Sequence, residues 1–176
     1  MNKQAPALLL AALLGLSQCK KKDPDPVDQL PPATQTGANT FGCLVNGQVW
    51  TPQGNDGTAN YTAYYDRTFR GGNFGIRVYR LDKKASQDII MGGDSISRVG
   101  TYSLIRVPRT VYFGDNQQPA TCQSQDGKSS QYCRGGLTIT RLDTQIGIVS
   151  GTFWFTLYKP GCDSIRVTDG RFDRKL

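Results

Sequence analysis

Short runs that alternate apolar and polar residues, separated by turn-forming residues, constrain the fold of this chain most strongly. Three of them occupy the C-terminal third, at 137–140, 151–158 and 165–168. A period of two places alternate side chains on one face of a strand, so the runs predict an antiparallel meander. Its predicted inner face consists of Leu137, Ile139, Phe153, Phe155, Leu157, Ile165 and Val167. Its predicted outer face consists of Thr138, Thr140, Trp154, Arg166 and Thr168.

The N-terminal part of the same domain repeats this organisation. Residues 43–45 and 48–50 flank Asn46-Gly47, a dipeptide typical of tight hairpins because both turn positions require positive φ. Further strands are predicted at 61–65, 74–81, 88–91 and 101–105, and a helical turn only at 82–86. Residues 41–176 suit a single domain in length. We therefore predict an all-β fold, an antiparallel β-sandwich or a small barrel of about eight to ten short strands.

The first 19 residues have the layout of an export signal. An almost wholly Leu and Ala run at 7–16 follows one positive charge, Lys3, and is shorter than the roughly 20 residues of a membrane-spanning helix. Leu16-Ser17-Gln18-Cys19 is similar to the cleavage box of bacterial lipoproteins. The resemblance implies a cleaved signal peptide at 1–18 and an acylated Cys19 that anchors the protein in the outer membrane, on its periplasmic or cell-surface face. The alternative is a buried N-terminal helix with a chance cysteine.

Residues 19–40 are predicted to be a flexible tether between the lipid and the domain. The segment contains Pro24, Pro26, Pro31 and Pro32 and has no apolar periodicity. Proline-rich linkers are extended, so this one would hold the domain on the order of 50–60 Å from the lipid. Its first residues, three lysines followed by an aspartate, are also similar to the signals that send some Bacteroidota lipoproteins to the cell surface.

Four segments of the chain carry a resemblance to a known family. Residues 43–52, 137–143, 150–155 and 169–173 resemble segments of a family of uncharacterised Bacteroidota surface lipoproteins, a β-rich domain of unknown function. The resemblance implies a lipid-anchored β domain. It implies no activity, and no catalytic residue is carried over from it.

Four cysteines follow Cys19, and export to an oxidising compartment makes disulfides the default interpretation. Four cysteines allow three pairings. We favour Cys122 with Cys133, because they flank a loop-like segment that a bridge would stabilise by about 2–3 kcal/mol. Cys43 with Cys162 would then join the first strand to the last, the alternative being buried free thiols. Zinc is not expected, since the sequence has neither a Cys-x-x-Cys motif nor a histidine.

The chain contains no histidine, and all 14 of its acidic residues are aspartates. Ser-His-Asp and Cys-His catalysis are therefore excluded, as are histidine-ligated metals. A pair of aspartates of the glycosidase kind remains conceivable, and the candidates are Asp94, Asp115, Asp126, Asp163, Asp169 and Asp173. All of them suit turns, where the Asp side chain bonds its own backbone. Calcium loops at 55–57 or 114–116 lack the alternating acidic spacing, so turns are favoured there too. No cofactor, metal or enzymatic activity is predicted.

Charge and aromatic residues indicate what the domain could bind. The net charge is +7, and it falls to +6 once residues 1–18 and their Lys3 are removed. The basic residues are dispersed and no nucleic-acid-binding module accompanies them, so nucleic acid is not an expected partner. A positive field would steer the domain toward anionic envelope glycans and headgroups, but a solvated strand face that keeps the protein soluble is the favoured explanation. The candidate ligand platform, for sugar rings or a protein partner, consists of Tyr61, Tyr64, Tyr65 and Trp154.

These observations predict a membrane-anchored extracytoplasmic lipoprotein, acting as a non-catalytic binding or structural module. Its predicted partners are the membrane, through Cys19, and a glycan or an envelope protein. The alternative is a glycan-active hydrolase that uses paired aspartates.

Overall fold

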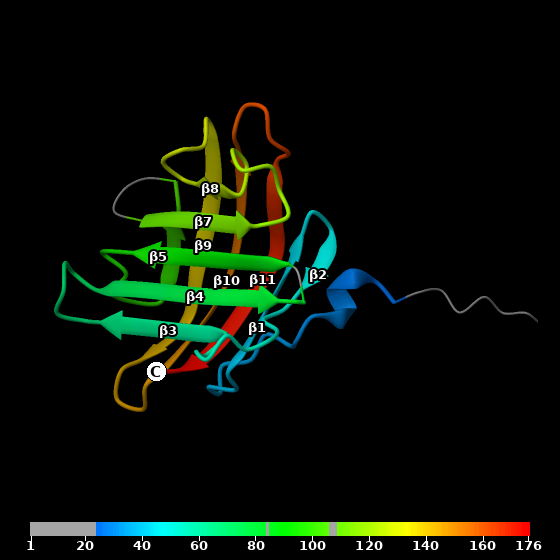
Figure 1. Ribbon diagram of the computed structural model, residues 1–176. Helices are drawn as coiled ribbons and strands as arrows, with labels where there is room; N and C mark the ends of the chain where they lie inside the picture. Colours follow the sequence, from blue (N-terminus) through cyan, green and yellow to red (C-terminus); the bar gives the residue numbers. More distant parts are fainter. Residues whose placement is uncertain (1–23, 84, 106–108) are drawn as a thin grey trace, which may run out of the picture.

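The computed structural model describes residues 24–83, 85–105 and 109–176 (Figure 1). The predicted signal peptide and Cys19 lie outside the described residues. The described chain is all-β, with eleven strands in two antiparallel sheets that pack as a sandwich. The predicted fold class is confirmed as a sandwich, and no closed barrel forms among the described strands. No helix in the described ranges is long and apolar enough to cross a membrane.

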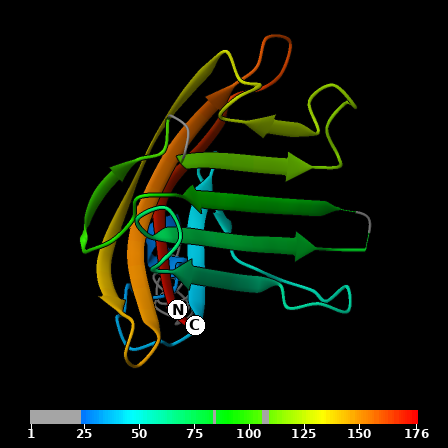
Figure 2. The ribbon, with the colours of Figure 1, turned by 90° about the vertical axis from the view of Figure 1, so that its left-hand side faces the viewer.

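One sheet has six strands and the other five. The six-stranded sheet has the order β2-β1-β11-β10-β9-β6. Its strands are β1 (Thr40–Val45), β2 (Gln48–Trp50), β6 (Gly100–Ser103), β9 (Tyr132–Asp143), β10 (Ile148–Tyr158) and β11 (Ile165–Lys175). The five-stranded sheet has the order β3-β4-β5-β7-β8. Its strands are β3 (Tyr61–Asp66), β4 (Asn73–Leu81), β5 (Ser86–Gly93), β7 (Arg109–Asp115) and β8 (Ser124–Asp126). Figure 2 shows the strands of one sheet crossing those of the other.

The predicted meander is confirmed, because β9, β10 and β11 are antiparallel neighbours. All seven of its predicted inner residues are buried between the sheets. There they meet alternate residues of the five-stranded sheet, which are Phe74, Ile76, Val78, Ile89, Met91, Val111 and Phe113. The rings of Phe74 and Phe172 stack at a centroid distance of 5.7 Å and connect the two layers. The period-two pattern therefore generates the core directly.

The predicted Asn46-Gly47 hairpin is also confirmed. Both residues have positive φ, 49° and 81°, and Val45 pairs with Gln48 across the turn. A two-residue turn of this kind matches the twist of the flanking strands. It fixes the position of β2 at one edge of the six-stranded sheet.

Three sequence-based expectations about elements differ from the structure. The predicted helical turn at 82–86 is wrong: Asp82 N donates to Ala85 O and Ala85 N donates to Asp82 O, which closes a hairpin between β4 and β5. Strands β7 and β8 were not predicted, because 111–113 is apolar on both faces and β8 has only three residues. The run at 137–140 belongs to a longer, twelve-residue strand, because pairing with β10 continues back through Gly136 and Gly135 to Tyr132.

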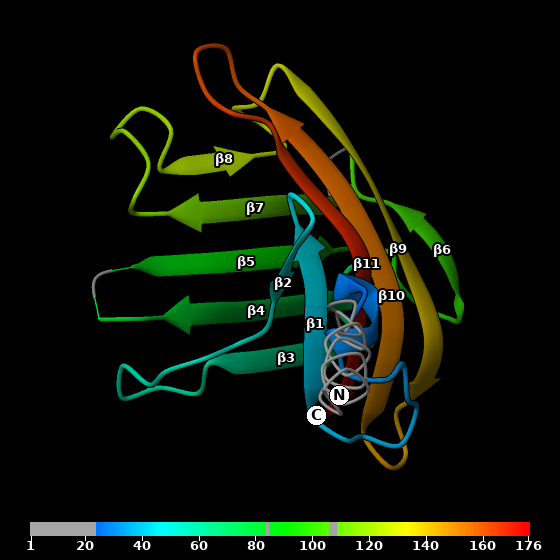
Figure 3. The same cartoon turned by 90° about the vertical axis from the view of Figure 1, so that its right-hand side faces the viewer.

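The predicted flexible tether is wrong for its described part, residues 24–39, which we call the N-terminal strap. The strap begins with a short 3-10 helix, η1 (Pro26–Gln29), that contacts β1 and β2. Leu30 is buried, and Leu30 and Pro31 cover Gly42, where a Cβ would lie 2.6 Å from Pro31 Cδ. Figure 3 shows the strap lying over the outer face of the six-stranded sheet. A proline-rich sequence therefore forms part of the folded domain because a complementary surface receives it.

The disulfide also differs from the predicted pairings. Cys122 is bonded to Cys162, and the bond joins the β7–β8 loop to the β10–β11 loop with a Cα–Cα distance of 5.6 Å. Both predicted pairings, Cys122–Cys133 and Cys43–Cys162, are wrong. Proximity in sequence misled the first, because Cys122 precedes β8 of one sheet whereas Cys133 lies in β9 of the other.

The two remaining described cysteines are free thiols. Cys43 is fully buried on the inner face of β1, and this burial raises the pKa of its thiol. Burial raises the pKa of the Cys133 thiol as well, and the negative charge of Asp126 adds to the effect. Both thiols are therefore held protonated, which makes them poor nucleophiles.

Candidate functional site

A cleft of about 420 Å³ opens at one end of the sandwich, between the two sheets. There the end of β4, the start of β5 and the end of β7 face the β1–β2 hairpin and the start of β11 (Figure 1). The residues that line this inter-sheet cleft are Val45, Asn46, Gln48, Val49, Trp50, Arg80, Asp82, Ala85, Gln87, Phe113, Asp115, Gln118, Asp163 and Ile165. Its walls combine buried apolar side chains with amides and charged groups.

A chain of side-chain hydrogen bonds orders one wall of the inter-sheet cleft. The buried Trp50 indole donates Nε1–H to Gln87 Oε1 at 2.9 Å. Gln87 Nε2 in turn donates to Asp115 Oδ2 at 2.9 Å, and the backbone N–H of Gln117 donates to Asp115 Oδ1 at 2.9 Å. Each donor fixes the orientation of the next group, so the amide and the carboxylate are held in place before any ligand arrives.

The charged groups of the inter-sheet cleft are not neutralised by one another. Arg80 donates to the backbone carbonyl of Val49 at 3.3 Å. The ion pairs within the described ranges are Arg70–Asp94 and Arg141–Asp143, and neither involves this cleft. One guanidinium and the carboxylates of Asp82, Asp115 and Asp163 therefore line a single concave surface. This part of a basic protein carries an excess of negative charge.

Only two of the six candidate aspartates meet in this cleft. Asp115 and Asp163 line it, together with Asp82, which was not among the candidates. Asp94 is buried at the opposite end of the five-stranded sheet, where Asn73 Nδ2 donates to it at 2.6 Å. Asp126 accepts the backbone N–H of Lys128 in a turn, as predicted. Asp169 lies within β11 with a φ of 53°.

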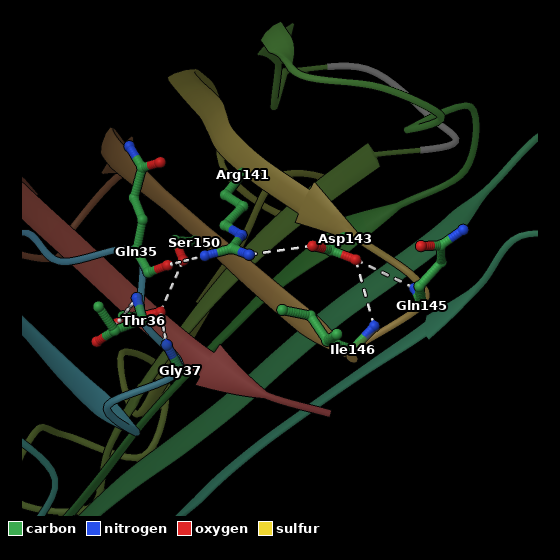
Figure 4. A network of polar contacts seen from close by, with 9 residues as sticks. Gln35, Thr36, Gly37, Arg141, Asp143, Gln145, Ile146 and Ser150 are labelled. Carbon is green, nitrogen blue, oxygen red and sulfur yellow. Dashed lines mark hydrogen bonds and ion pairs between the residues drawn. The ribbon is translucent and has the colours of Figure 1, made fainter.

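The sixth candidate, Asp173, is buried in β11, so its predicted place in a turn is wrong. Its carboxylate holds the N-terminal strap to the six-stranded sheet. It accepts hydrogen bonds from the Thr34 hydroxyl at 2.7 Å and from the Ser150 hydroxyl at 2.7 Å. It also accepts the backbone N–H groups of Thr36, Gly37 and Ala38 at 2.9 to 3.0 Å. Figure 4 shows Thr36 and Gly37 beside Ser150 in this network.

The hydrogen bonds to Asp173 determine its ionisation. Burial alone would raise its pKa, but hydrogen bonds from Ala38 N, the Ser150 and Thr34 hydroxyls and Gly37 N outweigh that effect. The pKa of Asp173 is therefore held well below its usual range. A neighbouring contact extends the network: Arg141 donates to Gln35 O in the strap and pairs with Asp143 at 3.0 Å. This cluster attaches the strap to the sheet, and both carboxylate oxygens of Asp173 and of Asp143 accept hydrogen bonds within it.

The four residues of the predicted ligand platform do not form one surface, so that prediction is wrong. Tyr61 is buried on the inner face of β3, and Tyr65 packs against the same core. Tyr64 lies on the outer face of the five-stranded sheet and is 57% exposed. Trp154 lies on the outer face of the other sheet and is 50% exposed. Alternation along 61–65 already separates Tyr64 from the other two tyrosines, and this signal could have been used.

The two candidate calcium loops form turns. Asn55 Oδ1 accepts the backbone N–H of Gly57 at 2.7 Å, and Asp56 Oδ1 accepts that of Thr58 at 2.9 Å. Asp115 uses both oxygens for protein donors, as described above. Within the described ranges, no group of three or more potential metal ligands comes together.

Comparison with known proteins finds no match to this chain among protein-family models, curated proteins or solved structures. The chemistry of the site must therefore be inferred from its own geometry. The inter-sheet cleft offers oriented donors and acceptors above an apolar floor, which suits a polar ligand that also has an apolar face.

Proposed function

We propose that this protein is a lipid-anchored extracytoplasmic lipoprotein whose β-sandwich binds a glycan segment in the inter-sheet cleft without cleaving it. The observation that carries the proposal is the ordered chain Trp50–Gln87–Asp115 at the edge of a cleft with an apolar floor. A sugar ring presents hydroxyl groups at its rim and C–H groups on its faces. Preset amide and carboxylate groups can bind such hydroxyls, while Val49, Phe113 and Ile165 can contact the ring faces.

The anchor part of the proposal rests on the sequence around Cys19. Pro24, the first described residue, follows Cys19 by five residues, which span at most about 18 Å when fully extended. Because the strap is part of the domain, the sandwich would stand close to the lipid instead of at the end of a long spacer. Replacing Cys19 by Ala should abolish labelling with radioactive palmitate and leave the protein extractable from membranes by concentrated salt, which does not release an acylated chain. A variant that stays membrane-bound, from a parent that is not labelled, would remove the anchor from this proposal.

A glycan hydrolase is the second candidate, because Asp115 and Asp163 line the same cleft. Glycoside hydrolysis requires two carboxyl groups, one of which delivers a proton to the leaving oxygen. Asp115 instead accepts an N–H donor at each oxygen, which is the arrangement of an oriented acceptor. Binding is therefore the function that we favour.

A glycan array screened with the mature chain carrying Cys19→Ala tests the binding proposal. Asp115→Asn should weaken binding of the best glycan about tenfold, the usual loss for a hydrogen bond to a charged group. Gln145→Ala, in the exposed β9–β10 turn, is the matched control and should bind like the parent. Silence of the parent across the array would contradict the proposal. Release of new reducing ends from a bound glycan, lost in Asp115→Asn, would establish the hydrolase instead.

A further inference from the structure

The outer face of the six-stranded sheet carries a second surface that the glycan cleft does not use. Beside the N-terminal strap, β9, β10 and β11 present aromatic and basic side chains that are exposed or half-exposed. We call this surface the aromatic–arginine patch, and it consists of Tyr132, Arg134, Trp154, Tyr158, Arg166 and Arg171.

The register of β9, β10 and β11 brings these side chains together. Tyr158 pairs with Tyr132, and Thr156 lies between Arg134 on one side and Arg166 on the other. Thr152 pairs with Arg171. Trp154, between these two rows, pairs with Gly136.

The aromatic rings of the patch remain accessible. Trp154 is 50% exposed, Tyr132 is 42% exposed and Tyr158 is 38% exposed. A Cβ on Gly136 would lie 2.8 Å from Trp154 Nε1, so the indole lies across this glycine, along the sheet surface. The Arg134 guanidinium stands over the Tyr132 ring at 5.4 Å.

The basic groups of the patch have no charged partner within the described ranges, where the ion pairs lie elsewhere. Asp169 is the nearby exposed carboxylate, and Arg171 Nε donates to its backbone oxygen at 3.2 Å. Three guanidinium groups against one carboxylate leave the patch positive. Trp, Tyr and Arg together are the side chains that prefer the boundary between water and lipid.

The N-terminal strap shows which way this face points. The strap lies on the same face of the same sheet (Figure 3). Its Ala33 lines a depression of about 440 Å³ together with Trp154 and Arg171. The acyl chains on Cys19 would start within about 18 Å of Pro24, where the described strap begins. An anchor attached to this side holds this side toward the bilayer.

We infer that the aromatic–arginine patch seats the domain on an anionic phospholipid surface, an inference that rests on the proposed lipid anchor for its orientation. The arginines meet the phosphates of the headgroups, and Trp154, Tyr132 and Tyr158 enter the interfacial region. The outer face of the five-stranded sheet, on the opposite side of the sandwich, then faces away from the membrane.

The test uses the mature chain with Cys19→Ala, which cannot be acylated, and sedimentation with lipid vesicles. The parent should bind phosphatidylglycerol–phosphatidylethanolamine vesicles and bind pure phosphatidylcholine vesicles much more weakly. Arg134→Gln with Arg166→Gln should weaken binding about 25-fold, about fivefold for each basic group near the surface. Arg77→Gln with Tyr64→Phe, on the outer face of the other sheet, is the matched control and should bind like the parent.

Tryptophan fluorescence supplies a second readout that does not depend on a destabilising substitution. The chain has two tryptophans, of which Trp50 is buried and Trp154 exposed. Anionic vesicles should shift the emission of the parent to shorter wavelength, and Trp154→Phe should abolish the shift.

Four outcomes would overturn the inference: no vesicle binding by the parent, equal binding to both lipid mixtures, an equal loss in the control, or a shift that persists in Trp154→Phe. Competition by a soluble glycan, without any preference for anionic lipid, would reassign the patch to glycan. Because this protein lacks acyl chains, the result does not depend on whether Cys19 is modified. Conversely, palmitate labelling and the effect of Asp115→Asn on the glycan array do not depend on the patch.

Discussion

The outer faces of the two sheets use the same arrangement of ring and glycine but differ in what surrounds it. Trp154 lies across Gly136 of β9 on one face, and Tyr64 lies across Gly75 of β4 on the other, where a Cβ would overlap the ring. Each ring covers backbone that a glycine leaves bare, while its own outer surface stays in solvent.

The surroundings separate the two faces. Arginines and the N-terminal strap flank Trp154, whereas Tyr64 borders an apolar groove of about 380 Å³ that also includes Ile90 and Gly92. Beside the groove Arg77 acts on a neighbouring carboxylate: burial raises the pKa of Asp88, and the charge of Arg77 opposes that effect. Alternation along the strands therefore accounts for both outer faces. The arginines and the N-terminal strap make the outer face of the six-stranded sheet the more polar of the two.

The largest expected effect comes from removing the disulfide that connects the two sheets. Cys122→Ser with Cys162→Ser removes a disulfide between residues 40 apart in sequence. The chain-entropy model gives a loss of about 4 kcal/mol in the free energy of unfolding. Urea denaturation measures it, with Cys133→Ser as the control for a free thiol. A loss below about 1 kcal/mol would mean that the sheets need no covalent connection.

The next prediction concerns the attachment of the N-terminal strap, which only one of the two faces carries. Asp173→Ala removes the acceptor for three strap amides and the Ser150 hydroxyl, leaving buried donors without a partner. We expect a loss of about 3 kcal/mol in the free energy of unfolding. The amides of 36–38 should also exchange hydrogen much faster, as measured by hydrogen–deuterium exchange. Asp169→Ala, on the same strand, is the exposed control, and an equal effect there would contradict the role of Asp173.

The pH dependence of stability tests whether the negative charge of Asp173 contributes to this attachment. The pKa of Asp173 is lowered by folding, so its contribution is fully present above the unfolded value of about 3.9 and is lost as the pH falls toward the folded value. Folding also lowers the pKa values of Asp56, Asp66, Asp126 and Asp143. The pH dependence of wild-type stability therefore does not separate the contribution of Asp173 from theirs. The difference in unfolding free energy between wild type and Asp173→Asn should shrink from pH 7 to pH 3. A constant difference would show that charge is unimportant at this position.

The smallest effect tests the arrangement that the faces share. Gly136→Ala and Gly75→Ala should each displace an exposed ring at a cost of about 1 kcal/mol or less, because the atoms that must move are side-chain tips. Gly136→Ala should also alter the fluorescence of Trp154, whereas Gly75→Ala should leave it unchanged. Thermal unfolding and emission spectra check both variants. A large loss at either glycine would mean that the ring is held more firmly than its exposure suggests.

Much of the fold could be predicted from the sequence, because it depends on local patterns. The meander and the Asn46-Gly47 turn follow from period-two alternation and from positive φ, which are properties of neighbouring residues. The docked strap could not be predicted, since Leu30 is its one buried apolar residue and its acceptor, Asp173, lies in the last strand. The disulfide partners likewise meet only once both sheets exist.

The candidate site was harder to predict than the fold. Asp115 and Asp163 were recognised as candidates, but Gln87 and Arg80 belong to residue types that carry no specific signal outside their geometry. The predicted aromatic platform rests on aromatic residues in β-like segments, but alternation along β3 places Tyr64 on the opposite face from Tyr61 and Tyr65. The neighbours of Trp154 are set by the register of β9 to β11, and a single sequence does not specify that register.

The attachment of the strap to Asp173 also sets an order of events during folding. The bonded groups are separated by 135 to 139 residues, so they can meet only after β11 has been synthesised and paired with β10. Contacts at such long separation close late, because the entropy of the intervening chain must be lost first. The segment nearest the proposed lipid is therefore made early and immobilised last. A segment that stands near the start of the chain thus completes the domain only after the last strand is in place.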